Sequence, residues 1–235
     1  MKAVILAGGR GTRLKPYTNV FPKPLMPVGE KPILEIIINQ LVAHGIKDII
    51  ITVGHMSALI MNFFGDGSRV GANIRYFEEE KPLGTSGNLG SLKEELTDTF
   101  MVINGDTLTT LNYSDMIDAH VRNGGIATIA LKKREVYIDF GTVEVDDANN
   151  IREYIEKPTL SYLVSIGVNI FNPRVLDYIN AGERLDFPDL VRTLISSGET
   201  VKGYIFDGYW LDIGRPADYD KANEEIEQIK GQLGI

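Results

Sequence analysis

Residues 2–16 read KAVILAGGRGTRLKP, and this stretch decides the class of fold. An uninterrupted apolar run from Ala3 to Leu6 ends directly in a glycine-rich segment. Such a run predicts a strand that is buried on both faces, as in a parallel sheet. Glycines at its end let the backbone turn tightly and bring N–H groups close to a bound phosphate or base. The stretch therefore predicts an α/β fold that binds a nucleotide.

The spacing of these glycines fits neither of the two common nucleotide motifs. A P-loop requires G-x-x-x-x-G-K-[ST], and no glycine–lysine pair stands at the required distance. A dinucleotide fingerprint, G-x-G-x-x-G, could begin at Gly9 and continue with Gly11, but Leu14 occupies its third position. The prolines that follow, at positions 16 to 27, indicate an extended loop instead of a helix. A nicotinamide-dependent oxidoreductase is therefore disfavoured.

Groups suited to phosphate follow the first strand. The three glycines from Gly8 to Gly11 can present N–H groups, and Thr12 adds a hydroxyl. Arg13 carries a planar guanidinium that matches phosphate oxygens. Lys23 stands between two prolines, which stiffen the backbone that presents it. Each residue alone would fit a solvated surface turn, but together, directly after a buried strand, they favour phosphate binding.

Two aspartates are candidates for a metal site. Asp106 ends the apolar segment MVINGD, so we expect it at the carboxyl edge of the sheet, where open α/β folds bind ligands. An ordinary turn aspartate is the alternative. Asp212 follows Trp210 and Leu211, and a carboxylate in such an apolar setting is costly unless it is paired or bound to a metal. Two carboxylates with water or phosphate oxygens make a normal Mg²⁺ shell.

Apolar periodicity extends the fold over the rest of the chain. In the first part we expect strands over residues 2–8, 48–54, 73–80 and 99–106, and helices over 33–45, 56–67 and 85–96. This alternation predicts a Rossmann-like α/β fold with a mostly parallel central sheet flanked by helices. In the second part we expect β-rich segments over 126–134, 140–158, 162–173 and 201–214, with a hairpin turn at 145–151, and helices over 173–182, 187–198 and 216–233. One domain over 1–235, with a nucleotide-binding half (1–110) and a C-terminal half of mixed strands (111–235), is the simplest organisation.

Composition sets the outer limits. A net charge of −8 argues against a broad nucleic-acid or anionic-membrane surface. The absence of cysteine excludes disulfides, thiolate metal sites and a cysteine nucleophile. No apolar run reaches the roughly 18 residues of a membrane span, and the N-terminal run is too short for a signal peptide. We therefore expect a cytoplasmic protein with neither membrane nor nucleic-acid partners.

The stretch LAGGRGTRLKPYTNVFPKPLMPVGEKPILE, residues 6–35, resembles the signature of the sugar-phosphate nucleotidyltransferases. The resemblance continues, in that family's order, through PLGTSG (82–87), NGD (104–106), EKP (156–158) and WLDIG (210–214). It covers essentially the whole chain. It implies a fold of the nucleotide-diphospho-sugar transferase type and the reaction of an NTP with a sugar 1-phosphate to give an NDP-sugar and pyrophosphate. The C-terminal left-handed β-helix of many relatives is not expected.

The resemblance also implies residue roles. The catalytic set is Arg13, Lys23, Asp106 and Asp212, and the two aspartates hold Mg²⁺. The nucleotide-binding set is Leu6, Ala7, Gly8, Gly9, Gly11, Thr12, Arg13, Lys23, Gly84, Thr85 and Gly105. The sugar-phosphate-binding set is Gly141, Glu156, Lys157 and Asn169, so the resemblance implies that the half over 111–235 is the sugar-binding half. For Glu156 and Lys157, the residues alone would also fit a solvated strand end.

A second glycine turn, at Gly84, bears on the base. It opens a predicted helix, where free N–H groups can bind a base edge, and Thr85 or Ser86 can act as its N-cap. The pattern E-x-x-P-L-G-T-(A/S)-G resembles guanylyltransferases that act on mannose 1-phosphate or a heptose 1-phosphate, which favours GTP. A uridylyl- or thymidylyltransferase and a non-catalytic regulatory subunit remain alternatives. Because two-fold dimers are the commonest assemblies, a homodimer is the expected oligomer.

Overall fold

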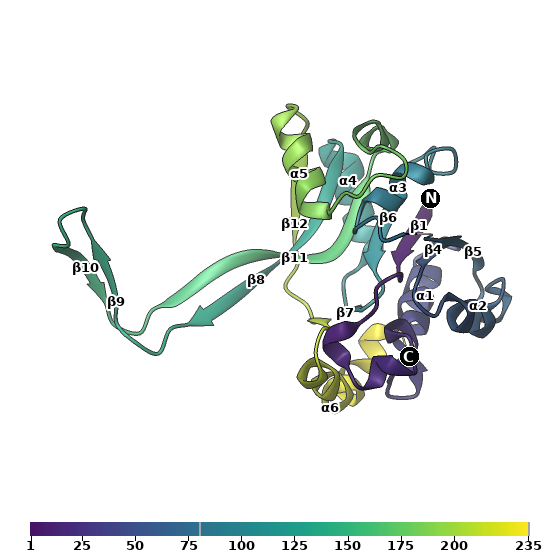
Figure 1. Ribbon diagram of the computed structural model, residues 1–235, viewed down its shortest axis with the longest axis horizontal. Coiled ribbons are helices and arrows are strands. Elements are labelled where there is room, and N and C mark those ends of the chain that lie inside the picture. Colours follow the sequence, from purple (N-terminus) through teal and green to yellow (C-terminus); the bar gives the residue numbers. More distant parts are fainter. Residues whose placement is uncertain (80, 235) are drawn as a thin grey trace.

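The computed structural model describes residues 1–79 and 81–234. Its centre is a seven-stranded sheet built from β1 (Lys2–Leu6), β4 (Asp48–Val53), β5 (Asn73–Glu78), β6 (Phe100–Asn104), β8 (Ala127–Tyr137), β11 (Thr159–Phe171) and β12 (Val201–Ile205). The strand order is β12-β8-β11-β6-β1-β4-β5 (Figure 1). Neighbouring strands pair in parallel except at β11, which runs antiparallel to both β6 and β8. The predicted Rossmann-like, mostly parallel sheet is therefore confirmed.

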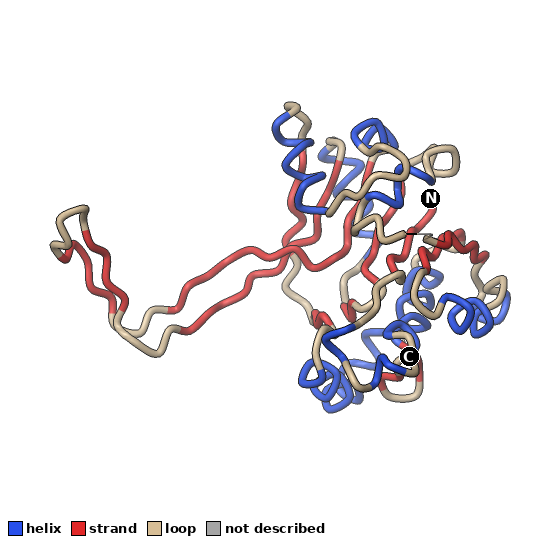
Figure 2. The backbone as a smooth tube through the Cα atoms, in the orientation of Figure 1, coloured by secondary structure: helices blue, strands red, loops and turns tan. Residues whose placement is uncertain are grey.

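Helices cover both faces of this sheet (Figure 2). One face is covered by α1 (Ile33–Ala43), α2 (Ser57–Phe64), α4 (Tyr113–Asn123) and α6 (Pro216–Leu233), and the other by α3 (Gly87–Ser91) and α5 (Phe187–Ser196). Ala3 and Ile5 pack into the first core, whereas Val4 packs into the second. Because successive residues of a strand point to opposite faces, β1 must be apolar at consecutive positions from Ala3 onward. This two-sided burial is the reason for the apolar run in the sequence.

Most predicted strands and helices are confirmed, with three differences. The predicted helix over 85–96 shrinks to the five residues of α3, because the chain after Ser91 continues in turns, in which the N–H of Glu95 donates to the carbonyl of Leu92 at 2.9 Å. The predicted helix over 173–182 is a 3₁₀ turn, Pro173–Tyr178. The sequence patterns did not reveal α4, since its buried side chains are few and its surface is polar. Glu80, which ends the predicted strand over 73–80, and Ile235, which ends the predicted domain, lie outside the described residues.

Small elements crowd the carboxyl edge of the sheet. After β1 the chain forms three 3₁₀ turns, Thr12–Leu14, Tyr17–Asn19 and Lys23–Leu25, instead of a helix, as the prolines predicted. The two-residue strands β2 (Pro27–Val28) and β3 (Lys31–Pro32) follow. The short strand β7 (Thr107–Thr109) pairs antiparallel with β13 (Trp210–Asp212). This pairing brings a segment from near the C-terminus to the end of β6.

A long arm leaves the body of the molecule (Figure 1). Residues 132–164 form it: the outer parts of β8 and β11 continue as a two-stranded ribbon, and β9 (Thr142–Val145) and β10 (Ile151–Ile155) make a hairpin at its tip. The predicted turn at 145–151 is confirmed, because Asp146 Oδ1 accepts hydrogen bonds from the backbone N–H groups of Ala148 and Asn150 at 3.0 and 2.9 Å.

No helix in the described part of the chain combines the length and apolar character needed to cross a membrane.

Candidate active site

The site begins where three parallel strands end side by side. The N–H of Ala7 donates to the carbonyl of Thr52 at 2.9 Å, and the N–H of Gly105 donates to the carbonyl of Leu6 at 2.9 Å. These bonds tie the ends of β4 and β6 to the end of β1. A Cβ on Gly105 would lie 2.8 Å from the Leu6 oxygen, so a side chain there would push the strands apart. The glycine before Asp106 is thus required by this close approach.

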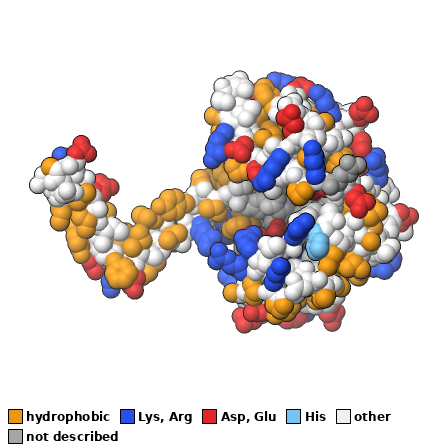
Figure 3. Space-filling model, viewed as in Figure 1, with side chains coloured by type: hydrophobic (Ala, Val, Ile, Leu, Met, Phe, Trp, Pro, Cys, Tyr) orange, Lys and Arg blue, Asp and Glu red, His pale blue; other side chains and the backbone are white. Residues whose placement is uncertain are grey.

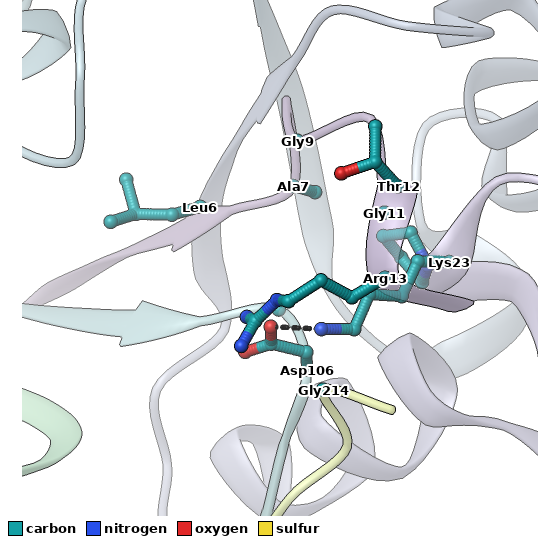
Figure 4. A pocket seen from close by; sticks show the side chains of 11 residues that line it. Leu6, Ala7, Gly9, Gly11, Thr12, Arg13, Lys23, Asp106 and Gly214 are labelled. Atoms are coloured by element: carbon teal, nitrogen blue, oxygen red, sulfur yellow. Dashed lines mark hydrogen bonds and ion pairs between the residues drawn. The ribbon is translucent and has the colours of Figure 1, made fainter. Parts of the chain in front are cut away.

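The glycine loop folds over this edge. Gly11 has φ +59°, and a Cβ on it would lie 2.9 Å from Cγ2 of Thr18. The hydroxyl of Thr18 donates to the Gly11 carbonyl at 2.8 Å, while Leu14 anchors the turn in the core with no exposed surface. Thr12 and Arg13, between these fixed points, flank the cavity seen in Figure 4. The loop is therefore held on one side so that its other side is left for a ligand.

Lys23 is unusual for a loop lysine because it is only 8% exposed. It opens the 3₁₀ turn Lys23–Leu25, and its ammonium group forms an ion pair with Asp106 Oδ2 across the cavity (Figure 4). The other oxygen of Asp106, Oδ1, is buried and has no hydrogen-bond partner among the described residues. A buried carboxylate oxygen without a partner is costly, so this atom indicates a ligand.

Asp212 lies beside Asp106 because of the β7–β13 pairing. The register places Asp212 opposite Thr107, and the N–H of Ile213 donates to the Asp106 carbonyl at 3.0 Å. The pKa of Asp212 is raised, mainly by burial and then by the negative charge of Asp106, although Lys23 and Arg13 oppose this shift. Two carboxylates that repel each other in a half-buried setting are stabilised by a shared cation.

The donor set at this point fits a divalent metal ion. Both side chains offer carboxylate oxygens, the ligands that Mg²⁺ prefers, and Asp106 has a buried oxygen with no other partner. Two protein carboxylates are few, which is typical of sites where substrate phosphates and water supply the remaining ligands. The predicted metal residues are therefore placed together and are chemically suitable.

Three neighbouring cavities open around the end of β1. The first, of about 250 Å³, is lined by Leu6, Ala7, Gly9, Gly11, Thr12, Arg13, Lys23, Pro24, Gly105, Asp106 and Gly214. The second, of about 320 Å³, is lined by Leu6, Gly8, Gly9, Thr52, Glu79, Pro82, Gly84, Thr85, Asn88, Asn104 and Asp106. The third, of about 210 Å³, includes Leu6, Thr85 and Asn169. The structure thus gathers every residue of the predicted nucleotide-binding set around one edge.

The second cavity contains a carboxylate that the sequence analysis did not single out. Glu79 accepts a hydrogen bond from the amide of Asn88 at 2.8 Å, which fixes its orientation. Its Oε1 approaches the glycine loop so closely that a Cβ on Gly8 would lie 2.3 Å away. The first letter of the pattern E-x-x-P-L-G-T was the available signal. Thr85 also differs from expectation, because its hydroxyl accepts the N–H of Phe187 at 2.7 Å and so caps α5 instead of α3.

The predicted sugar-phosphate residues are not brought together within one chain. Asn169 lies in the third cavity, 3% exposed, and its Oδ1 has no partner among the described residues. Gly141, Glu156 and Lys157 lie on the arm, away from these cavities. There, the hydroxyl of Tyr154 donates to Glu156 Oε2 at 3.1 Å and packs against Gly141.

Comparison with known proteins relates this chain to one family. The sequence profile described as nucleotidyl transferase matches residues 2–229. A UTP–glucose-1-phosphate uridylyltransferase of Synechocystis is 37% identical over 98% of this chain and 66% of its own length. A mannose-1-phosphate guanylyltransferase of Mycobacterium tuberculosis is 32% identical over 95% of this chain and 64% of its own length. The chain thus spans about two thirds of the length of these curated relatives.

A solved structure matches over nearly the full length of both chains. A Bacillus anthracis protein provisionally named glucose-1-phosphate thymidylyltransferase, solved in complex with sucrose, superposes with a TM-score of 0.80 at 27% identity. The match covers 100% of this chain and 99% of that one. Family and fold are therefore supported by independent comparisons of sequence and of structure.

Proposed function

Because the chain belongs to the nucleotidyl transferase family, we propose that it transfers a nucleoside monophosphate from an NTP to a sugar 1-phosphate and releases pyrophosphate. The observation that carries this proposal is the Lys23–Asp106 ion pair, beside Asp212, in the cavity formed by the glycine loop. A cation and two carboxylates beside a loop that can hold phosphates are the groups that this reaction needs. The arrangement is expensive to maintain without such a role, because Asp106 and Asp212 repel each other.

The chemistry requires no protein nucleophile. An oxygen of the sugar phosphate attacks the α-phosphorus of the NTP, and the bond from that phosphorus to the oxygen bridging the β-phosphate breaks. Pyrophosphate leaves with the electron pair. The protein therefore contributes by positioning the two substrates and by stabilising negative charge as it moves to the leaving group.

Each charged group has a place in this scheme. Lys23, fixed by its turn and by Asp106, would stabilise charge on the α-phosphate, and its shielding from water makes that interaction stronger. Arg13 would bind the phosphates that depart. Asp106 and Asp212 would hold a divalent cation, which we propose is Mg²⁺ and which supplies further charge neutralisation at phosphate oxygens when bound.

We propose guanine as the base, on the position of Glu79 in the second cavity. Guanine presents two adjacent donors on its Watson–Crick edge, and a carboxylate accepts both. Uracil and thymine present one donor flanked by two carbonyl oxygens, which a carboxylate repels. The identity of the Synechocystis relative, a uridylyltransferase, supports the alternative.

Replacing Glu79 separates these alternatives. Glu79→Gln should lower kcat/KM for GTP by on the order of 10- to 100-fold, because a hydrogen bond to a charged group contributes about 1.5–3 kcal/mol. The same change should leave UTP unaffected or improved. Glu78→Gln is the matched control, since Glu78 bonds Ser57 at the surface and lies outside the cavity. Equal effects of the two variants on GTP would remove Glu79 from base recognition.

The sugar phosphate is proposed to bind on the side of Asn169, whose buried amide oxygen has no partner in the described chain. Mannose 1-phosphate or a heptose 1-phosphate is the expected acceptor, following the resemblance of the E-x-x-P-L-G-T-S-G segment. Glu156, Lys157 and Gly141 are proposed to complete this subsite, and the arm must then be placed over a site for them to do so.

A substrate matrix tests the function as a whole. The purified chain should be incubated with Mg²⁺, each of several NTPs and each of several sugar 1-phosphates, and pyrophosphate release measured. Release that requires both substrates and is abolished by Asp106→Asn supports the proposal. Binding of a sugar nucleotide without pyrophosphate release under any combination would indicate a regulatory subunit instead.

A further inference from the structure

The arm, residues 132–164, is a structural element without a partner in its own chain. Its strands pair only with each other, β8 with β11 and β9 with β10, and no other described strand joins them. A two-stranded ribbon in water is marginally stable at best, because it buries little surface and leaves both edges unpaired. Figure 1 shows it extending well beyond the body of the protein. Something must therefore cover it.

The arm also exposes an unusual amount of apolar surface (Figure 3). Its large hydrophobic side chains with substantial exposure are Val136, Tyr137, Phe140, Val143, Val145, Ile151, Tyr154, Ile155, Leu160, Tyr162 and Leu163. In the tip hairpin four of these side chains share one face, since Val143 stands opposite Tyr154 and Val145 opposite Ile151, whereas Ile155, opposite Thr142, lies on the other face. Contiguous apolar surface of this kind marks an interaction site.

Charge shows what kind of surface the tip fits. On its other face, Glu144 stands directly opposite Glu153, a pairing that destabilises an isolated hairpin. The tip segment, residues 138–158, carries six acidic residues, Asp139, Glu144, Asp146, Asp147, Glu153 and Glu156, against two basic ones, Arg152 and Lys157. The opposed carboxylates indicate that the tip binds a surface that carries positively charged groups.

A cluster of cations lies at the root of the arm. A cavity of about 520 Å³ there is lined by Arg13, Lys132, Lys133, Arg134, Arg215 and Lys221, together with Asp212, Asp218, Trp210 and Leu211. Lys and Arg side chains gather where the arm meets the body (Figure 3). This root groove offers the positive charge that the tip lacks, and Trp210 and Leu211 add apolar surface on which the apolar side chains of the tip can pack.

The tip cannot reach the root of its own chain. The ladder between β8 and β11 is unbroken from the pair Lys132–Val164 to the pair Tyr137–Thr159. At about 3.3 Å per residue this ribbon holds the hairpin on the order of 20 Å from the root. Folding it back would break several of these backbone pairs.

We propose that two copies of this chain exchange arms, so that the acidic tip of each docks in the basic root groove of the other. Tip and root belong to the same chain, so one two-fold axis satisfies both contacts at once. The apolar faces of the two ribbons are covered in the same arrangement. The occupant of the root groove is thus a second copy of this protein.

In the dimer with exchanged arms, residues of each protomer complete the catalytic site of the other. The root groove shares Arg13 with the first cavity and contains Asp212. A docked tip therefore brings Glu156 and Lys157 of one protomer to the metal-binding carboxylates of the other. This consequence rests on the proposed function, and it accounts for the separation of these residues from the site within one chain.

Light scattering on the full chain tests the exchange without reference to activity. The wild type should be a dimer. Reversing the tip charges (Glu144→Lys with Glu153→Lys) or the root charges (Lys133→Glu with Arg134→Glu) should give monomers, because like charges then meet. An equimolar mixture of these two variants should form heterodimers, since both contacts are again between opposite charges. This recovery also shows that each variant is folded.

Two results would overturn the exchange. A monomeric wild type at the concentration used for activity would exclude it. A dimer that persists in both charge-reversed variants, with no preference for the mixed pair, would place the interface elsewhere.

A mixing experiment separates exchange from an arm that folds back on its own site. The Asp106→Asn variant has a damaged site and an intact arm, whereas the Lys157→Ala variant has a damaged arm and an intact site. Mixed dimers with exchanged arms contain one intact site, so an equilibrated mixture should regain about a quarter of wild-type activity. No regain, or full activity of Lys157→Ala alone, would overturn the shared site. An inactive wild type that still dimerises would instead refute the proposed reaction and leave the exchange standing.

Discussion

Replacing Lys23 by methionine removes the ammonium group and keeps most of the side-chain volume. Lys23 is 8% exposed and forms the ion pair with Asp106, so the substitution acts on a charge that water does not replace. Two consequences follow. The site loses the cation proposed to stabilise the α-phosphate, and Asp106 is left beside Asp212 without its partner.

The size of the catalytic effect follows from the shielding of this group. Removing one preorganised donor from a site of developing negative charge lowers kcat by about 10²- to 10³-fold, or roughly 2.7–4 kcal/mol. Stability should also fall, because breaking a buried ion pair costs about 3–5 kcal/mol. The Asp106 side chain is 25% exposed, so water relieves part of that penalty and we expect a loss of about 1–3 kcal/mol.

Steady-state kinetics of pyrophosphate release, with the NTP varied, separate kcat from KM. If Lys23 acts mainly in the transition state, kcat should fall more than NTP affinity. Thermal unfolding without substrates gives the change in stability. Lys15→Met is the matched control, because Lys15 also precedes a proline but is exposed and does not line the cavities. It should leave both measurements unchanged.

A Lys23→Met enzyme with the kcat of the wild type would exclude Lys23 from stabilising the transition state. A rate loss equal to that of Lys15→Met would exclude this role as well, since a general loss of positive charge would then explain the effect.

Asp212→Asn should abolish activity yet stabilise the metal-free chain near neutral pH, because burial raises the pKa of Asp212 and its ionised form is therefore the costly one. The gain in unfolding free energy should be complete above the raised pKa of Asp212 and should vanish as the pH falls below the ordinary pKa of a carboxyl group. Unfolding measured across a range of pH tests this, and a gain that persists in acid would contradict it. Gly84→Ala should lower the unfolding free energy by about 1–3 kcal/mol more than Gly182→Ala. Both glycines have a strongly positive φ, but only a Cβ on Gly84 would contact another atom, Asp186 Oδ1 at 2.6 Å. Equal melting temperatures of the two variants would contradict this prediction. Arg13→Lys keeps the charge but loses the planar fork, so KM for the NTP should rise about tenfold, and an unchanged KM would exclude a bidentate phosphate contact.

Local sequence was sufficient for the first strand and its loop. The apolar run, the glycines and the Lys–Pro steps act on neighbouring residues, so their effects are visible without knowing the rest of the fold. The same holds for the tip hairpin, whose turn is held by bonds from Asp146 to residues two and four positions away. Local sequence does not predict the role of Thr85, because its hydroxyl caps a helix that begins 102 residues further along the chain.

The sequence by itself determined that a buried parallel strand leads into a glycine-rich loop, and that the residues which we propose for nucleotidyl transfer are present. Only the tertiary structure decided that Lys23 meets Asp106, 83 residues away, with Asp212 beside them. It also decided that Glu156 and Lys157 lie on the arm, away from the cavities at the end of β1. The physical reason is that strand order and register fix such distant neighbours, and periodicity along one segment carries no information about the segment that will pack against it.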